Sequence, residues 1–265
     1  MKNPSPITGR EIWKITLCLT VTCALAAAVL GAVFYFTEPA KQANMAVREI
    51  SAVRRLLDLS ADAKIIEVRR YIDAKETVVG YLLVDALQEY DTQGNFLKKI
   101  PKPVSLLNAL GEVLDAWVEK EFLDSHFVGR FFMAQDASGK EAGFVTESSQ
   151  YGFKSSIRFF VALTPDFQIR GVEVISHEED PGLGAEIAKP LFKDQFVGLR
   201  PEDLLTLKLL KGPKPKEVPL PEKEKQIYAV TGATISSKAL VDGVRQAVVH
   251  LEHRLQIVEG KRGAR

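Results

Sequence analysis

The sequence predicts an α+β fold, in which a single N-terminal transmembrane helix is followed by an exported domain with an antiparallel sheet and flanking helices. Three observations lead to this prediction. One long run of residues lacks any charge, several short segments of strand character are joined by tight turns, and amphipathic helices interrupt these strands irregularly. Irregular interleaving of strands and helices is typical of α+β domains.

The overall composition is that of an ordinary globular protein. Hydrophobic residues make up 46% and charged residues 26% of the 265 residues, which argues against collagen, a coiled coil and wholesale disorder. The length fits one or two domains. The chain has 35 basic and 34 acidic side chains, so it lacks the basic excess that nucleic-acid binding usually needs. We therefore expect no nucleic-acid partner.

The uncharged run covers 23 residues, from Ile15 to Thr37. At a rise of 1.5 Å per residue, a helix of this length exceeds the roughly 30 Å hydrocarbon core of a bilayer. Trp13 stands at one end and the aromatic residues 34–36 at the other, as interfacial aromatics do. We therefore predict a transmembrane helix at 15–37, which contacts the lipid bilayer and follows a short tail at 1–14.

A cleaved signal peptide is the alternative, because Ala24-Leu25-Ala26 offers a small-residue cleavage pattern. The uncharged run is long for a signal peptide, so a retained anchor is favoured. Basic residues outnumber acidic ones by two before the run and are balanced after it. This bias predicts a cytoplasmic N-terminus and a periplasmic or extracytoplasmic C-terminal domain.

Both cysteines, Cys18 and Cys23, lie inside the predicted span. Their simplest interpretation is that of small apolar residues facing lipid or packing in the span. The exported part then has no thiolate, no disulfide and no protein-ligated iron–sulfur cluster.

The exported part divides into three segments. Residues 38–100 are expected to hold a membrane-proximal amphipathic helix and the first strands, residues 101–258 the main domain, and residues 259–265 a basic C-terminal tail. Lys75–Tyr81 loosely echoes Lys140–Phe144, which fits either duplicated strand pairs or chance. A proline-rich loop is expected at 212–221. Helices are predicted at 39–60, 106–122 and 235–258, and strands at 64–71, 77–84, 130–134, 141–147, 155–163, 168–176 and 226–230.

The most informative motif is Thr-Gly-Ala-Thr-Ile-Ser-Ser at 231–237, which joins a short strand to the N-terminus of the last helix. Free backbone N–H groups and the positive end of the helix dipole converge at such a junction and favour a phosphate. Gly232 and Ala233 leave the backbone open to a ligand. The alternative is that Thr234 is a plain N-cap. No Walker motif is present, so nucleotide hydrolysis is not indicated.

This motif resembles the flavinylation motif of the exported FMN-binding domains of bacterial membrane redox complexes. In that family, FMN is attached through its phosphate to the hydroxyl of the last Thr of Ser/Thr-Gly-Ala-Thr, which is Thr234 here. The resemblance implies a covalent phosphothreonyl-FMN made by a separate flavin transferase, since a threonine hydroxyl is a poor nucleophile without activation. Many members carry Asp three residues before the Ser/Thr-Gly, where this chain has Tyr228.

A second segment, His177-Glu-Glu-Asp-Pro-Gly-Leu-Gly184, is similar to the family's His-x-Glu-Thr-Pro-Gly-Leu-Gly, with Asp180 in the Thr place. Taken alone, His177 would be a structural histidine and its neighbouring glutamates solvated. The resemblance implies instead that this segment lines the flavin site. The expected cofactor-binding residues are Thr234 as the covalent site, with Thr231, Gly232, Ala233, Ser236, Ser237, Lys238, His177, Glu179, Gly182, Leu183 and Gly184 around it.

Other groups of residues give weaker indications of a metal or catalytic site. His250 and His253 are three apart on the last helix, but no nearby carboxylate or thiolate completes a metal set, so no metal site is predicted. No Ser/His/Asp signature is present, and no catalytic residue is expected beyond the flavin.

The resemblance implies an electron-transfer subunit in the cell inner membrane of a bacterium. Within the family, the likeness is to the G subunits of the Rnf ion-translocating ferredoxin:NAD oxidoreductase and to the related C subunits of the sodium-pumping NADH:quinone reductase. Such a subunit relays electrons and needs other membrane subunits bearing flavin or iron–sulfur. The alternatives are a subunit of the quinone reductase, a regulatory FMN-domain protein, or an exported scaffold or sensor domain without flavin.

Overall fold

A computed structural model describes residues 9–106, 112–122, 125–212 and 225–258. The proline-rich loop at 213–221 and the tail at 259–265 lie outside these residues. The α+β prediction is confirmed, because the described chain combines an N-terminal apolar helix, antiparallel strands and flanking helices. By contacts, the chain forms two units, residues 1–51 and 52–265, and each is described by itself.

The described part of the N-terminal unit, residues 9–51, is helical. Helix α1 runs from Gly9 to Leu57, so its residues 52–57 belong to the second unit. Its segment Ile12–Glu38 is long and apolar enough to cross a membrane. The side chains of this segment are exposed to the surroundings, as expected of a lipid-facing anchor. The separate helix predicted at 39–60 is therefore the continuation of the anchor helix.

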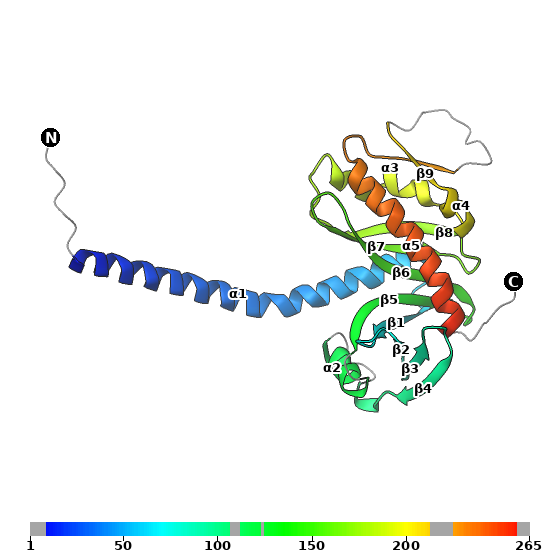
Figure 1. The fold of residues 1–265 in the computed structure, drawn as a ribbon, viewed down its shortest axis with the longest axis horizontal. Coiled ribbons are helices and arrows are strands. Elements are labelled where there is room, and N and C mark those ends of the chain that lie inside the picture. Colours follow the sequence, from blue (N-terminus) through cyan, green and yellow to red (C-terminus); the bar gives the residue numbers. More distant parts are fainter. Residues whose placement is uncertain (1–8, 107–111, 123–124, 213–224, 259–265) are drawn as a thin grey trace. The chain divides into compact units, whose positions relative to one another are not determined.

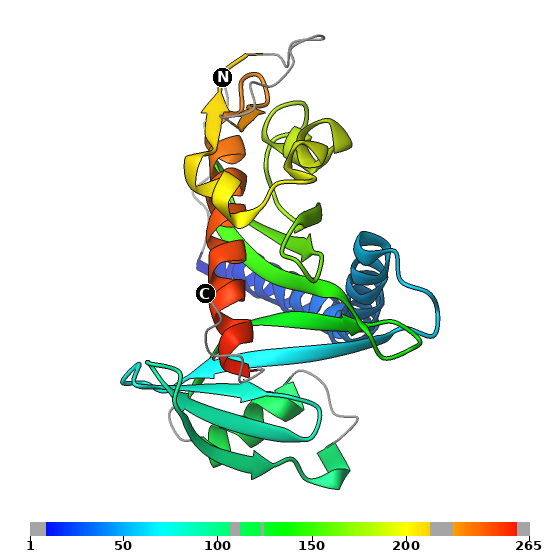
Figure 2. The same ribbon diagram turned by 90° about the vertical axis from the view of Figure 1, so that its right-hand side faces the viewer.

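The second unit is organised around one large antiparallel sheet (Figure 1, Figure 2). Its strand order is β4-β3-β2-β1-β5-β6-β7-β8, so the two meanders β1–β4 and β5–β8 meet through β1 and β5. The strand bounds are β1 Lys64–Ile72, β2 Val78–Leu82, β3 Ala86–Asp91, β4 Phe96–Pro101, β5 His126–Gln135, β6 Glu141–Tyr151, β7 Ser156–Leu163 and β8 Ile169–Ser176.

The first hairpin of each meander is built in the same way. Gly80 of β2 lies opposite Tyr71, and Gly143 of β6 lies opposite Ala134. The turns between these strands are each tied by an aspartate side chain, Asp73 or Asp136, that accepts backbone N–H groups. The two segments that echo each other in the sequence thus lie in hairpins of similar construction within one sheet.

The second meander is covered on both faces. Alternate residues of its strands point to opposite sides, so Phe160 packs with the last turns of α1, whereas Phe159 packs with α5. Helix α5, Thr234–Val258, lies across β6 and β7 (Figure 1, Figure 2). Helix α2, Glu112–Glu121, packs through Leu114 and Val118 against the first meander.

Short elements connect β8 to α5 and place the site. They are η2 Gly184–Ala188, α3 Pro190–Lys193, η3 Asp194–Phe196, α4 Pro201–Thr206 and the parallel strands β9 Lys208–Leu210 and β10 Gln226–Tyr228. A further short helix, η1 Val104–Leu106, precedes α2. The domain boundary predicted at 100–101 falls at the end of β4, within the unit that begins at Ala52.

Candidate functional site

The candidate site begins where β10 turns into α5. The carbonyl of Ala233 accepts the amide of Ser237 at 3.0 Å, so Thr234 is the first helical residue. Gly232 has a φ of +80°, a left-handed conformation that glycine adopts without strain. The first amides of α5 therefore lack intrahelical partners and face the turn at the positive end of the helix dipole.

The hydroxyl of Thr234 is not used as a helix cap. Thr234 occupies the first helical position, and its hydroxyl has no hydrogen-bond partner among the residues that the structure describes. The cap position belongs to Ala233, whose side chain offers no acceptor. The side chain of Ser237 instead accepts the Val230 amide at 3.0 Å and ties the turn together. The interpretation of Thr234 as a plain N-cap is therefore wrong.

The loop after β8 brings a carboxylate to this helix terminus. Glu179 is only 4% exposed, and the hydroxyl of Ser236 in the first turn of α5 donates to it. The carboxylate also accepts three backbone amides of the β6–β7 turn, from residues 153, 154 and 155, at 3.0–3.2 Å. One buried side chain thus joins the β6–β7 turn, the β8 loop and the start of α5.

The charge of Glu179 is stabilised by these donors. Burial raises the pKa of the carboxyl, but the hydrogen bonds from Ser236 and from the three amides outweigh burial and hold the pKa below its usual value. Because hydrogen bonds to an ionised acceptor favour the ionised form, Glu179 is a carboxylate at neutral pH.

These elements enclose a cavity of about 380 Å³. Its walls come from the β6–β7 turn, the β8 loop and the first turn of α5. The structure therefore brings together most of the residues predicted from the two motifs. The lining residues are Phe153, Glu179, Asp180, Leu183, Gly184, Gly232, Ala233, Thr234, Ile235 and Ser236.

Five predicted residues lie outside the lining of this cavity. The ring of His177 accepts the Glu179 amide through Nδ1 at 3.2 Å, so it orders the loop. Ser237 holds the turn at Val230, as described above. Lys238 forms an exposed ion pair with Asp242 at 3.5 Å. Gly182 shapes the exposed loop with a φ of +74°, and Thr231 faces the neighbouring cavity. Roles for these five in binding remain predictions.

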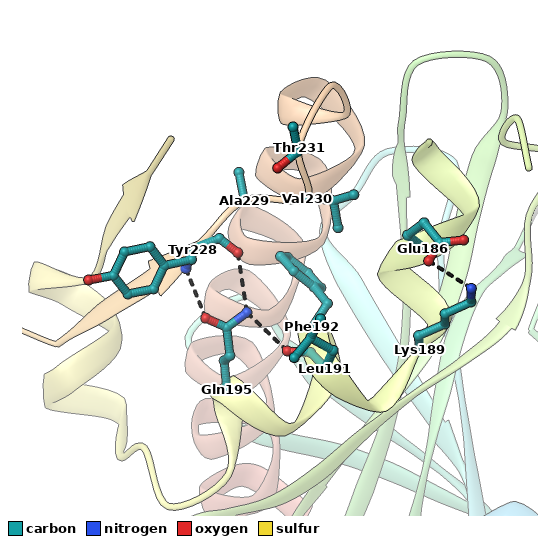
Figure 3. Close-up of a pocket in the computed structure, with 9 residues that line it drawn as sticks. All are labelled: Glu186, Lys189, Leu191, Phe192, Gln195, Tyr228, Ala229, Val230 and Thr231. Carbon is teal, nitrogen blue, oxygen red and sulfur yellow. Dashed lines mark hydrogen bonds and ion pairs between the residues drawn. The ribbon is translucent and has the colours of Figure 1, made fainter. Parts of the chain in front are cut away.

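A neighbouring cavity, of about 300 Å³, is lined by Thr231 and by residues of α3, η3 and β10 (Figure 3). The amide side chain of Gln195 accepts the N–H of Tyr228 at 2.9 Å and donates to its carbonyl at 3.2 Å. Phe192 and Leu191 from α3 form its apolar wall. Tyr228 thus stands beside the motif, where the family often carries Asp.

Sequence reasoning missed Phe153, which lines the site, and Gln195, which lines the neighbouring cavity. Phe153 lies in the β6–β7 turn, and Gln195 lies in η3. Neither belongs to a motif, and each reaches its position only because the sheet and the β8 connection fold back on α5. In the part of the chain that the structure describes, no group of His, Cys, Asp and Glu could hold a metal ion.

Replacing Gly184 with alanine is expected to disrupt this site. A Cβ at this position would stand 2.5 Å from Oε2 of Glu179 and 2.8 Å from Oγ of Ser236. Such contacts force the Glu179–Ser236 hydrogen bond apart, and we expect a loss of about 1–3 kcal/mol in the free energy of unfolding. Chemical denaturation of the full-length protein measures this loss. Unchanged stability would show that the carboxylate can move without cost.

Comparison with known proteins agrees with this geometry. Residues 152–249 match the FMN-binding domain family. The chain is 28% identical to the G subunit of the ion-translocating oxidoreductase complex of Methanosarcina acetivorans, over 91% of this chain and 94% of that relative. It is 34% identical to the G subunit of the proton-translocating ferredoxin:NAD(+) oxidoreductase complex of Clostridium ljungdahlii, over 43% of this chain and 56% of that relative.

Among solved structures, the crystal structure of Shewanella oneidensis NqrC is similar at 19% identity and a TM-score of 0.46. The match covers 76% of this chain and 94% of the NqrC chain. The matched family segment contains the β6–β7 turn, the β8 loop and the start of α5, which are the three parts of the cavity. Residues 152–249 thus match the FMN-binding domain family behind an N-terminal apolar helix, and over nearly its whole length the chain is similar to the G subunit of the Methanosarcina acetivorans complex.

Proposed function

We propose that this chain is a membrane-anchored flavoprotein subunit that holds FMN covalently on Thr234 and relays electrons within an ion-translocating ferredoxin:NAD oxidoreductase of Rnf type. The observation that carries the proposal is the free hydroxyl of Thr234 at an uncapped helix terminus, on the wall of a cavity inside the segment that matches the FMN-binding family. The similarity to the G subunit of the Methanosarcina acetivorans complex supports the choice of complex.

The residues present fit the phosphate of FMN. The first amides of α5 point to the turn and provide donors, and the helix dipole favours an anion there. Gly232 lets the backbone approach a ligand closely. Attachment forms a bond between Oγ1 of Thr234 and phosphorus, releases the threonine proton, and expels the other substituent of the activated flavin donor with its electron pair. A flavin transferase would supply that donor and activate the hydroxyl.

When bound, FMN would supply the redox chemistry, and the protein would supply tethering and orientation. Glu179 would hold the two loops of the cavity against α5 through its four hydrogen bonds. Leu183, which is 47% exposed, would offer an apolar surface to the flavin ring. Phe153, exposed on the opposite loop, would do the same.

The wider setting follows from the same reasoning. The N-terminus would lie in the cytoplasm and the FMN-binding domain in the periplasm or another extracytoplasmic space, as the basic residues before the anchor predict. The electron partners would be other membrane subunits bearing flavin or iron–sulfur. A covalent bond would keep the cofactor from escaping into a compartment where it is not made.

Mass spectrometry of the full-length protein tests the covalent bond. When the protein is co-expressed with a flavin transferase, we expect one adduct with the mass of FMN less one water, on the peptide that contains Thr234. In-gel fluorescence under denaturing conditions gives a second readout, since only covalent flavin survives. A protein without adduct or fluorescence after this treatment would favour the scaffold or sensor alternative.

A further inference from the structure

A second cavity lies toward the other end of α5, between that helix and the first meander of the sheet. It has a volume of about 500 Å³. Arg70 of β1 and Tyr81 of β2 line one side, and His250, His253 and Arg254 of α5 line the other. Arg254 is 20 positions after Thr234 on α5, which places it about 30 Å along the helix. The cavity is therefore separate from the candidate flavin site.

Among the residues that the structure describes, the two arginines of this cavity have no ion-pair partner. The Nε atom of Arg70 is buried and has no hydrogen-bond partner, although the same side chain bonds to the Tyr81 phenol. Among the residues that the structure describes, no carboxylate forms an ion pair with Arg70 or Arg254. Asp91, which also lines the cavity, accepts the backbone amides of Gln93 and Asn95 within its own turn.

The electrostatic cost of this arrangement lowers the pKa values of two α5 side chains, Arg254 and His250. Burial, together with the charge of Arg70, lowers the pKa of Arg254 to about 10. Burial and then the charges of Arg254 and Arg70 lower the pKa of His250, so its ring is neutral at pH 7. The charges of Arg70 and Arg254 therefore repel each other within the cavity, and a bound anion would relieve the repulsion.

We propose that this cavity binds a phosphorylated anion, with its phosphate between Arg70 and Arg254. A guanidinium presents a planar fork of donors that matches phosphate oxygens, and the buried Nε of Arg70 is one such donor. Val79 and Val249 line the remaining wall and suit an apolar portion of the ligand. Cations near a helix C-terminus also complement the helix dipole, but that effect does not account for Arg70, which belongs to β1.

The same charges disfavour a metal ion at His250 and His253. Two guanidinium groups in the same cavity would repel a metal ion, and no acidic ligand completes a set among the described residues. The two histidines fit an anion better, because each ring can donate an N–H to phosphate.

Inorganic phosphate is the first probe. We expect phosphate, added to the full-length protein in detergent at constant ionic strength, to raise the melting temperature in comparison with chloride. Isothermal titration calorimetry is expected to show phosphate binding at this cavity that is at least tenfold weaker in Arg254→Gln and in Arg70→Gln. The matched control is Arg170→Gln, which removes an exposed arginine that pairs with Asp58 elsewhere on the surface. It is expected to bind phosphate as the wild type does.

Stability without ligand separates binding from a structural role. If Arg254 serves an anion, Arg254→Gln removes a half-buried, repelled cation, and the melting temperature of this variant without phosphate is expected to equal or exceed that of the wild type. Phosphate binding that is unchanged in both cavity variants overturns the proposal. So does a wild-type protein that phosphate neither stabilises nor binds.

Two further probes distinguish the sources of such a ligand. Glycerol 3-phosphate represents a soluble phosphorylated compound, and short-chain phosphatidic acid represents a lipid headgroup. Tighter binding of glycerol 3-phosphate assigns the cavity to a soluble ligand, whereas tighter binding of phosphatidic acid assigns it to a lipid. In either case Arg254→Gln is expected to reduce binding at least tenfold, and a variant that binds both probes normally contradicts the proposal.

Discussion

Replacing Thr234 with valine is expected to abolish covalent flavin attachment. Valine keeps the shape of the side chain but removes the hydroxyl that would form the phosphoester. That hydroxyl has no hydrogen-bond partner in the described part of the chain, so the free energy of unfolding is expected to change by no more than about 0.5 kcal/mol. The measurement is the flavin adduct by intact-protein mass, on a variant whose thermal unfolding is compared with that of the unflavinylated wild type.

The matched control is Thr231→Val, at the other threonine of the same turn. Thr231 is exposed and faces the neighbouring cavity, so this variant is expected to keep its covalent flavin. Retention of the adduct in Thr234→Val would move the attachment point elsewhere. Loss of the adduct in Thr231→Val with retention in Thr234→Val would assign it to Thr231.

Replacing Glu179 with glutamine is expected to cause the largest loss of stability in the site. The carboxylate accepts one hydroxyl and three backbone amides, while the amide group of glutamine would turn an N–H toward some of these donors. Buried donors would lose their acceptor, and we expect a decrease of about 2–4 kcal/mol in the free energy of unfolding. Urea denaturation of the full-length protein in detergent, followed by near-UV circular dichroism, measures the decrease.

The contribution of Glu179 is expected to depend on pH with a defined sign. Its pKa in the folded protein lies below the ordinary value of 4.5, so the fold prefers the ionised carboxylate. The stabilisation is therefore fully present above about pH 4.5 and is lost as the pH falls through the folded pKa. The stability difference between wild type and Glu179→Gln is expected to narrow over that acidic range. Other carboxylates with lowered pKa values are common to both proteins and cancel in the difference.

The neighbouring substitution Glu178→Gln is the control for this series. Glu178 is exposed, its backbone amide donates to the side chain of Ser155, and its carboxylate only adds to the field at the exposed Lys154. Its replacement is expected to change the free energy of unfolding by no more than about 0.5 kcal/mol. The carboxylate would be shown not to hold the loops together by either of two results. One is an equal decrease in the free energy of unfolding in both variants, and the other is a stability difference between wild type and Glu179→Gln that does not vary with pH.

Parts of the molecule could be predicted because they rest on local patterns. The anchor follows from 23 uncharged residues, and α5 follows from its apolar stripe, whose predicted start at residue 235 is one residue from the observed start. The α+β class followed from strands and helices that alternate irregularly. The long α1 was divided wrongly, because the pattern changes from uniformly apolar to amphipathic while the backbone remains helical to Leu57.

The sequence by itself determined that an apolar helix precedes a cysteine-free domain, and that two motifs, at 177–184 and 231–237, carry its most specific signals. The tertiary structure decided how these motifs meet. Only the folding of β8 back toward α5 places the buried Glu179 against Ser236, and it leaves Thr234 free on a cavity wall instead of serving as a cap. The tertiary structure also places Arg70 and Arg254, which are 184 positions apart in the sequence, in the lining of one cavity. Local pattern is visible in the order of residues, whereas contacts between distant segments depend on how the whole sheet packs against its helices.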